Sequence, residues 1–217
     1  MSRPTFPPPS AARVRSRRAG CTMALLALCL LPATAHAQSK CVSAKLDAMG
    51  KKESGLLSCL ASVAARGRAT SFGRCLQRIE NRYLRAYDLA GSCGTDDRPV
   101  CDCLTENCAV EVRVALPDLG PSKCEAKRLR GAGVQAMRKV RCNAKAAKAG
   151  MPVDPGCLQK ADAKFEAVFA KTGTCGGDQS AVDAIVNEQC VTGIGGDASG
   201  GGTVGDLCTS QACEGAD

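Results

Sequence analysis

The spacing of the cysteines constrains this chain more than any other feature. Seventeen residues separate Cys41 from Cys59, and the same gap recurs in three further pairs: Cys75/Cys93, Cys124/Cys142 and Cys157/Cys175. A step of eighteen residues corresponds to about five turns of an α-helix, so both cysteines of a pair lie on one helix face, roughly 27 Å apart. The spacing therefore predicts an all-α fold in which four helices combine in twos as antiparallel helical hairpins.

The two hairpins are predicted to be copies of one unit. The gaps between successive cysteines are 17, 15, 17 and 14 residues from Cys41 to Cys108, and 17, 14, 17 and 14 residues from Cys124 to Cys190. The residues between the cysteines agree as well, since a Cys-Leu-Gln tripeptide begins at both Cys75 and Cys157. This self-similarity indicates a tandem repeat, in which a short third helical segment follows each hairpin.

Antiparallel packing predicts which of these cysteines form disulfides. In each hairpin the two inner cysteines flank the turn between the helices, and the two outer cysteines meet at the open end. The predicted disulfides are Cys41–Cys93, Cys59–Cys75, Cys124–Cys175 and Cys142–Cys157. Six cysteines are expected to pair among themselves, with their connectivity left open: Cys101, Cys103, Cys108, Cys190, Cys208 and Cys213.

With these pairings the chain resembles the twin-cysteine helical hairpins, such as the twin CX9C proteins and the plant α-hairpinins. In those families inner cysteines pair with inner ones and outer cysteines with outer ones. The resemblance covers the four predicted helices, but the gap here is seventeen residues rather than nine or three. It therefore implies a shared architecture and no function.

The first 37 residues have the pattern of a secretory signal peptide. Four arginines between Arg13 and Arg18 precede a short apolar run, and Ala35-His36-Ala37 has the small-x-small form of a cleavage site. We expect cleavage after Ala37 and a secreted or periplasmic protein. The mature chain then has 24 basic and 21 acidic residues, no histidine and fourteen cysteines. A dense, even set of cysteines behind a signal peptide is typical of a disulfide framework in an oxidising compartment.

The repeats set the expected domain boundaries. Residues 38–116 and 123–192 form the two repeats, and residues 117–122 connect them. The glycine-rich segment 193–206 is expected to be a flexible linker to a cysteine-containing tail, residues 207–217. Alternating valines between Ala109 and Leu116 leave helix continuation and an extended connector as alternatives. In the first helix only Glu53 interrupts the apolar stripe.

No recognised catalytic constellation occurs in the sequence. Without a histidine in the mature chain a serine or cysteine nucleophile lacks its usual general base, and there is no phosphate-binding glycine loop. We therefore expect a non-catalytic scaffold or binding protein without a cofactor or metal.

The partner expected from the charge pattern is an anionic envelope or extracellular surface. Nucleic acid is not expected, because no aromatic residues are interleaved with the basic ones. The basic side chains that would contact the partner all belong to the third predicted helix: Lys127, Arg128, Arg130, Arg138, Lys139, Arg141 and Lys145.

Two alternative functions use other features. Cys101-Asp-Cys103 would serve a thiol-redox or metal-handling protein, although the six leftover cysteines suffice for three structural disulfides. Cross-linked helices with a basic stretch also suit a membrane-active, toxin-like protein. The mature net charge of about +3 and the absence of Trp disfavour that interpretation.

Overall fold

The computed structural model describes residues 31–67, 71–93, 98–116, 121–173, 175–201, 204–208 and 213, with side chains from Ser39 onward. The chain divides into two compact units, residues 1–34 and 35–217, and all contacts reported below belong to the second. Residues 1–30 of the predicted signal peptide lie outside the described residues. Residues 31–37 form the beginning of the first described helix.

The regular structure of the described residues is entirely helical, as the cysteine spacing predicts, and they include no strand. A π-helical segment, η2, directly continues the last α-helix. The elements are α2 (Leu31–Arg66), α3 (Phe72–Ala90), α4 (Arg98–Val114), α5 (Lys123–Ala149), α6 (Pro155–Lys171), α7 (Gln179–Ile185) and η2 (Val186–Thr192).

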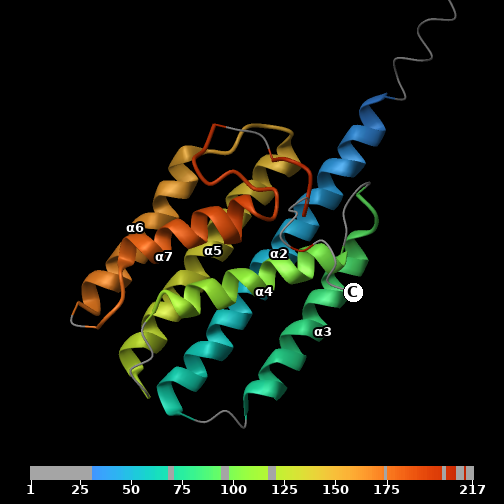
Figure 1. The fold of residues 1–217 in the computed structure, drawn as a ribbon. Coiled ribbons are helices and arrows are strands. Elements are labelled where there is room, and N and C mark those ends of the chain that lie inside the picture. Colours follow the sequence, from blue (N-terminus) through green and yellow to red (C-terminus); the bar gives the residue numbers. More distant parts are fainter. Residues whose placement is uncertain are drawn as a thin grey trace, which may run out of the picture. The chain divides into compact units, whose positions relative to one another are not determined.

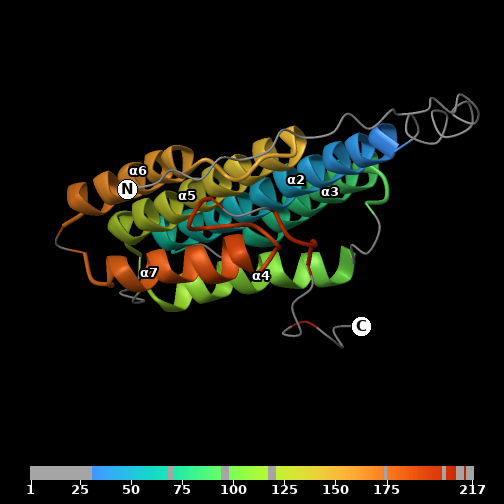
Figure 2. The same cartoon turned by 90° about the horizontal axis from the view of Figure 1, so that it is seen from above.

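The helices of residues 35–217 form two layers. Figure 1 shows α6, α5, α2 and α3 side by side in this order, with α4 and α7 running across the same face of the layer. In the view of Figure 2, α4 and α7 lie together on one side of the four long helices. The core lies between the layers and includes Leu46, Leu57, Leu129, Phe165 and Val186.

The central contact of the long-helix layer is an antiparallel crossing of α2 and α5. A Cβ atom at Gly50 would lie 3.0 Å from Cβ of Val140, and one at Gly133 would lie 3.1 Å from Cβ of Leu57. Because neither glycine has a side chain, the backbone of each helix can approach the other closely. Each glycine therefore accepts a branched side chain from the facing helix.

Seven disulfides join the described helices and the segments that follow them. Each hairpin has an inner and an outer disulfide, and their pairings match those expected from antiparallel packing: Cys41–Cys93, Cys59–Cys75, Cys124–Cys175 and Cys142–Cys157. The other six cysteines all connect to α4, through Cys101–Cys208, Cys103–Cys213 and Cys108–Cys190. Helix α4 therefore holds the C-terminal part of the chain through three disulfides.

The glycine-rich segment differs from the flexible linker that its composition suggests. Ile194 and Leu207 are buried, and the amide of Gly205 donates to the carbonyl of Gly195. Asn143 of α5, itself buried, bonds both the amide and the carbonyl of Asp197. The described part of this segment is thus packed against the helices, because its few apolar side chains and backbone groups find partners there.

Between residues 109 and 116 the structure has the helical alternative. Helix α4 continues to Val114, with Val112 and Leu116 buried and Val110 and Val114 exposed. The alternation of valines therefore reflects two sides of a helix end, not a strand.

The crossing predicts that Gly133 tolerates no side chain. Gly133→Leu should lower the free energy of unfolding by about 2 kcal/mol or more, because the added atoms meet Leu57 and the backbone of Ser54. The matched control is Gly73→Leu in α3, where a Cβ atom has nothing within 4 Å and a better helix former should be neutral or slightly stabilising. Urea unfolding with the disulfides intact measures both; equal effects of the two substitutions would contradict the crossing.

Candidate functional site: a basic groove between α5 and α6

The basic residues predicted to face a partner do not all lie at the surface. Lys127, Arg130, Arg141 and Lys145 are exposed and Arg138 is half-buried, but Arg128 and Lys139 are buried. The prediction is therefore wrong for these last two residues. Helical periodicity assigns them to the side of α5 that packs against the rest of the protein.

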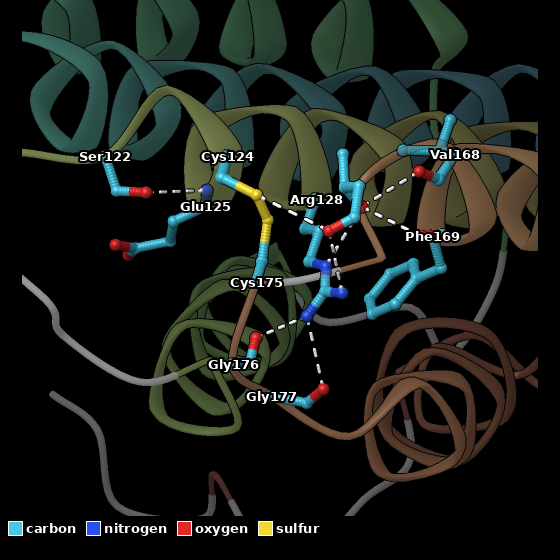
Figure 3. The surroundings of a disulfide bond; sticks show 10 residues. Ser122, Cys124, Glu125, Arg128, Val168, Phe169, Cys175, Gly176 and Gly177 are labelled. Carbon is cyan, nitrogen blue, oxygen red and sulfur yellow. Dashed lines mark hydrogen bonds between the residues drawn. A yellow bond between two sulfur atoms is a disulfide. The ribbon is translucent and has the colours of Figure 1, made fainter.

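Arg128 is used to close the second hairpin. Its Nε donates to the Thr172 hydroxyl at 3.1 Å, and its Nη1 donates to the carbonyl groups of Gly176 and Gly177 beyond the Cys124–Cys175 disulfide. The guanidinium also lies over the Phe169 ring, 4.5 Å from its centroid. Figure 3 shows Arg128 pointing into this loop, with the disulfide beside it. Its hydrogen-bond donors are thus used within the fold and do not face a partner.

Lys139, about three turns further along α5, also makes contacts within the fold. Its Nζ lies 2.6 Å from an oxygen of Asp162 in α6 and donates to the side-chain oxygen of Asn187 in η2 at 2.6 Å. The neighbouring Gln135 also donates to Asp162, at 2.8 Å, and to Asp183 in α7. These contacts fix α7 and η2 on α5, so the side of α5 that carries Gln135 and Lys139 is an internal one.

The remaining basic residues of α5 line a groove on another face of the α5/α6 pair. Two cavities of about 460 Å³ and 490 Å³ follow the seam between the helices and share Ala161 and Lys164. On α5 the lining residues run from Lys127 to Lys145, a length of roughly 27 Å at 1.5 Å per residue. We call this surface the α5/α6 groove.

Eight basic side chains line the α5/α6 groove, five from α5 and three from α6. None of the described residues that line it is acidic. Its floor is apolar and includes Val134, Phe165 and Val168. The eight are Lys127, Arg130, Arg138, Arg141, Lys145, Lys160, Lys164 and Lys171.

Sequence reasoning missed the three lysines of α6. A signal for them existed, because Lys160, Lys164 and Lys171 are spaced by four and seven residues and therefore share one face of a helix. Nothing in the sequence shows, however, that this face adjoins the basic side of α5.

Capping residues in the sequence set the ends of the two helices that form the groove. Ser122 caps α5 by accepting from the amide of Glu125 at 3.2 Å, and Gly150 ends the helix with a φ of 62°. Asp154 caps α6 in the same way, with Pro155 at its first position. The short turn between these signals folds α6 back along α5.

A second cluster of charges lies between α2, α3 and α4. The Lys52 side chain is fully buried, and its Nζ meets three carboxylates, at 2.9 Å from Glu80, 3.3 Å from Glu106 and in direct contact with Asp102. The three carboxylates have oxygens within 4.8 Å of one another, an arrangement that is also compatible with a metal ion. Here the ammonium group of Lys52 supplies the positive charge and links α2 to α3 and α4.

The two cysteines of the Cys101-Asp-Cys103 motif are not bonded to each other. Cys101 is fully buried and bonded to Cys208, and Cys103 is bonded to Cys213. Redox-active cysteines are usually accessible and occur as an exchanging pair, so these contacts do not favour the redox alternative.

Among the helices that the structure describes, none combines the length and apolar character needed to cross a lipid bilayer. Comparisons with protein-family models, curated proteins and solved structures gave no match.

Glu53 predicts a pH dependence of stability. It is fully buried with no hydrogen-bond partner for its carboxylate oxygens among the described residues, and burial raises its pKa well above the usual value. The folded chain therefore keeps a proton that the unfolded chain loses above about pH 4.3. As pH rises from there to the folded pKa, stability should fall by up to about 1.4 kcal/mol per pH unit.

Urea unfolding at pH 5 and pH 8 measures this effect. Glu53→Gln should be more stable than the wild type at pH 8 by a larger margin than at pH 5, because glutamine does not ionise. Glu166→Gln, at an exposed position of α6, is the control and should show no such difference. An equal margin at both pH values would mean that Glu53 does not titrate in this range.

Lys52 predicts a second contrast, with its neighbour as the control. Lys52→Met should cost about 2 kcal/mol or more in urea unfolding, because three carboxylates lose their buried counter-charge. Lys51→Met removes an exposed lysine whose ion pair among the described residues is with Asp47, one turn earlier, and should cost about 0.5 kcal/mol or less. Similar losses for both variants would show that the cluster contributes no specific stability.

Proposed function

We propose that the protein is a non-catalytic, secreted or periplasmic binding protein that holds an extended anionic partner along the α5/α6 groove. The partner class is an anionic polymer of an envelope or extracellular surface. One observation carries the proposal: eight basic side chains line about 27 Å of a single groove, and none of the described lining residues is acidic. A concave surface of one charge sign raises the local concentration of oppositely charged partners.

We further propose that the chain is a tandem duplication, with two copies packed about an approximate twofold axis. The α2/α5 crossing supports this, since Gly50 against Val140 and Gly133 against Leu57 are the same contact made twice, 83 residues apart. The cation–ring contacts support it as well. Lys45 lies 4.1 Å from the Tyr87 ring centroid, and Arg128 occupies the matching place on Phe169.

The duplication makes the groove specific to the second copy. At the positions matching Lys127, Arg130, Arg138, Arg141, Lys145 and Lys171, the first copy has Ala44, Asp47, Gly55, Ser58, Ser62 and Leu89. Only Lys160 and Lys164 have basic counterparts there, Arg78 and Arg82. If the positive charge served solubility alone, it would be expected on both copies. Its restriction to one groove supports a binding role.

Seven disulfides fit this role, because they are typical of proteins exposed to an oxidising compartment. A cross-linked scaffold also loses little further conformational entropy when the partner binds. No observation among the described residues favours the redox or the membrane-active alternative.

The proposal predicts salt-dependent binding to a linear polyanion, with heparin as the probe. Replacing four exposed groove residues by glutamine, Arg130, Lys145, Lys160 and Lys164, should weaken binding by about tenfold or more at low salt. The matched control removes the same charge from α3, through Arg74, Arg78, Arg82 and Arg85, all exposed. Binding that weakens equally in both variants would reflect net charge and would refute a role for the groove.

A further inference from the structure

One half of the α5/α6 groove has more apolar lining than a surface that binds only a charged polymer requires. This half is the cavity of about 460 Å³ between the first part of α5 and the last part of α6. Its volume lies within the range of small-molecule sites, roughly 300 to 1,000 Å³. We call it the Val134 cavity.

The floor of the Val134 cavity combines Val134, Phe165 and Val168 with the small residues Gly131 and Ala161. A Cβ atom at position 131 would lie 2.9 Å from Val168, so the glycine lets this valine settle against the backbone of α5. Val134 is one of the few large apolar side chains that remain exposed. Apolar surface of this kind gains from covering by an apolar ligand group.

All charged residues that line the cavity are cationic and lie at its rim: Lys127, Arg130, Lys164 and Lys171. Neither acidic residue of α6 lines the cavity, and one of them, Asp162, is engaged by Gln135 and Lys139. No ion pair of the described residues involves any of the four rim residues. Lysine and arginine can extend their apolar stems along the floor while their charged ends meet an anion at the mouth.

We propose that the Val134 cavity binds a single-chain amphiphilic carboxylate, with its hydrocarbon chain on the floor and its carboxylate among the rim cations. The proposal rests on the proposed function of the groove and names a ligand class for one half of it. A polyanion alone would contact the rim and leave the floor uncovered. A neutral hydrocarbon would cover the floor and leave four cations without a counter-charge.

The first repeat shows what the same position looks like without these features. The cavity between α2 and α3 has Lys51 where the second copy has Val134, and Lys52 where it has Gln135. Asp47 takes the place of Arg130. Of the four rim cations only Lys164 has a basic counterpart in this lining, Arg82, and a lysine stands where the Val134 cavity has its exposed valine. The chain is therefore expected to bind one equivalent.

The test is calorimetric titration of the full disulfide-bonded chain with monomeric decanoate, with decanol as the uncharged comparison. Decanoate should bind with one-to-one stoichiometry and decanol about tenfold or more weakly. Lys127→Gln/Lys171→Gln should weaken decanoate binding by about tenfold. The control Lys145→Gln/Lys160→Gln removes the same charge from the other half of the groove and should change it by about twofold at most.

A floor variant separates the cavity from the polymer site. Val134→Gln/Val168→Gln should weaken decanoate binding about fivefold or more and leave heparin binding unchanged. Circular dichroism of this variant checks that it is folded. Heparin binding without decanoate binding would overturn the cavity proposal and leave the proposed function standing. Decanoate binding without heparin binding would do the reverse.

Two further outcomes would overturn the inference. If the Lys145/Lys160 control weakened decanoate as much as the Lys127/Lys171 variant, the ligand would not be held by this rim. If the chain bound vesicles of an anionic phospholipid but not monomeric decanoate, the cations would serve a lipid surface and not a cavity ligand.

Discussion

The close crossing of α2 and α5 is the contact on which the rest of the structure depends. Two glycines allow each helix to receive a branched side chain of the other, so the backbones approach closely at the centre of the long-helix layer. The hairpin partners α3 and α6 then take the outer positions (Figures 1 and 2). The disulfides connect each partner to its central helix, which matters in a chain with so few large aromatic side chains.

Buried polar side chains fasten the second layer to the first. Lys52 joins α2 to α3 and α4, and Lys139 with Gln135 joins α5 to α6, α7 and η2. Such groups are costly to bury and stabilise only when they are satisfied, so they select one packing geometry for α4, α7 and η2. Glu53 is the exception, a buried acid with no comparable partner among the described residues.

The same buried contacts shape the candidate site. By turning Arg128 and Lys139 inward, the fold separates the cations that hold it together from those that line the α5/α6 groove. The groove charges are thus held on two packed helices, and among the described residues the one groove cation with an ion pair is Arg141, which lies 3.1 Å from Asp47. This separation makes a binding role physically reasonable.

The sequence alone determined the helices and the disulfides within each hairpin, because a gap of seventeen residues fixes both cysteines on one helix face. It also showed that Glu53 interrupts the apolar stripe of the first helix. Only the tertiary structure decided how α5 is rotated against its neighbours, and so which of its basic residues are exposed. It likewise brought Lys160, Lys164 and Lys171 to the groove, paired the last six cysteines and packed the glycine-rich segment. These features depend on contacts between residues far apart in the chain, which local periodicity does not encode.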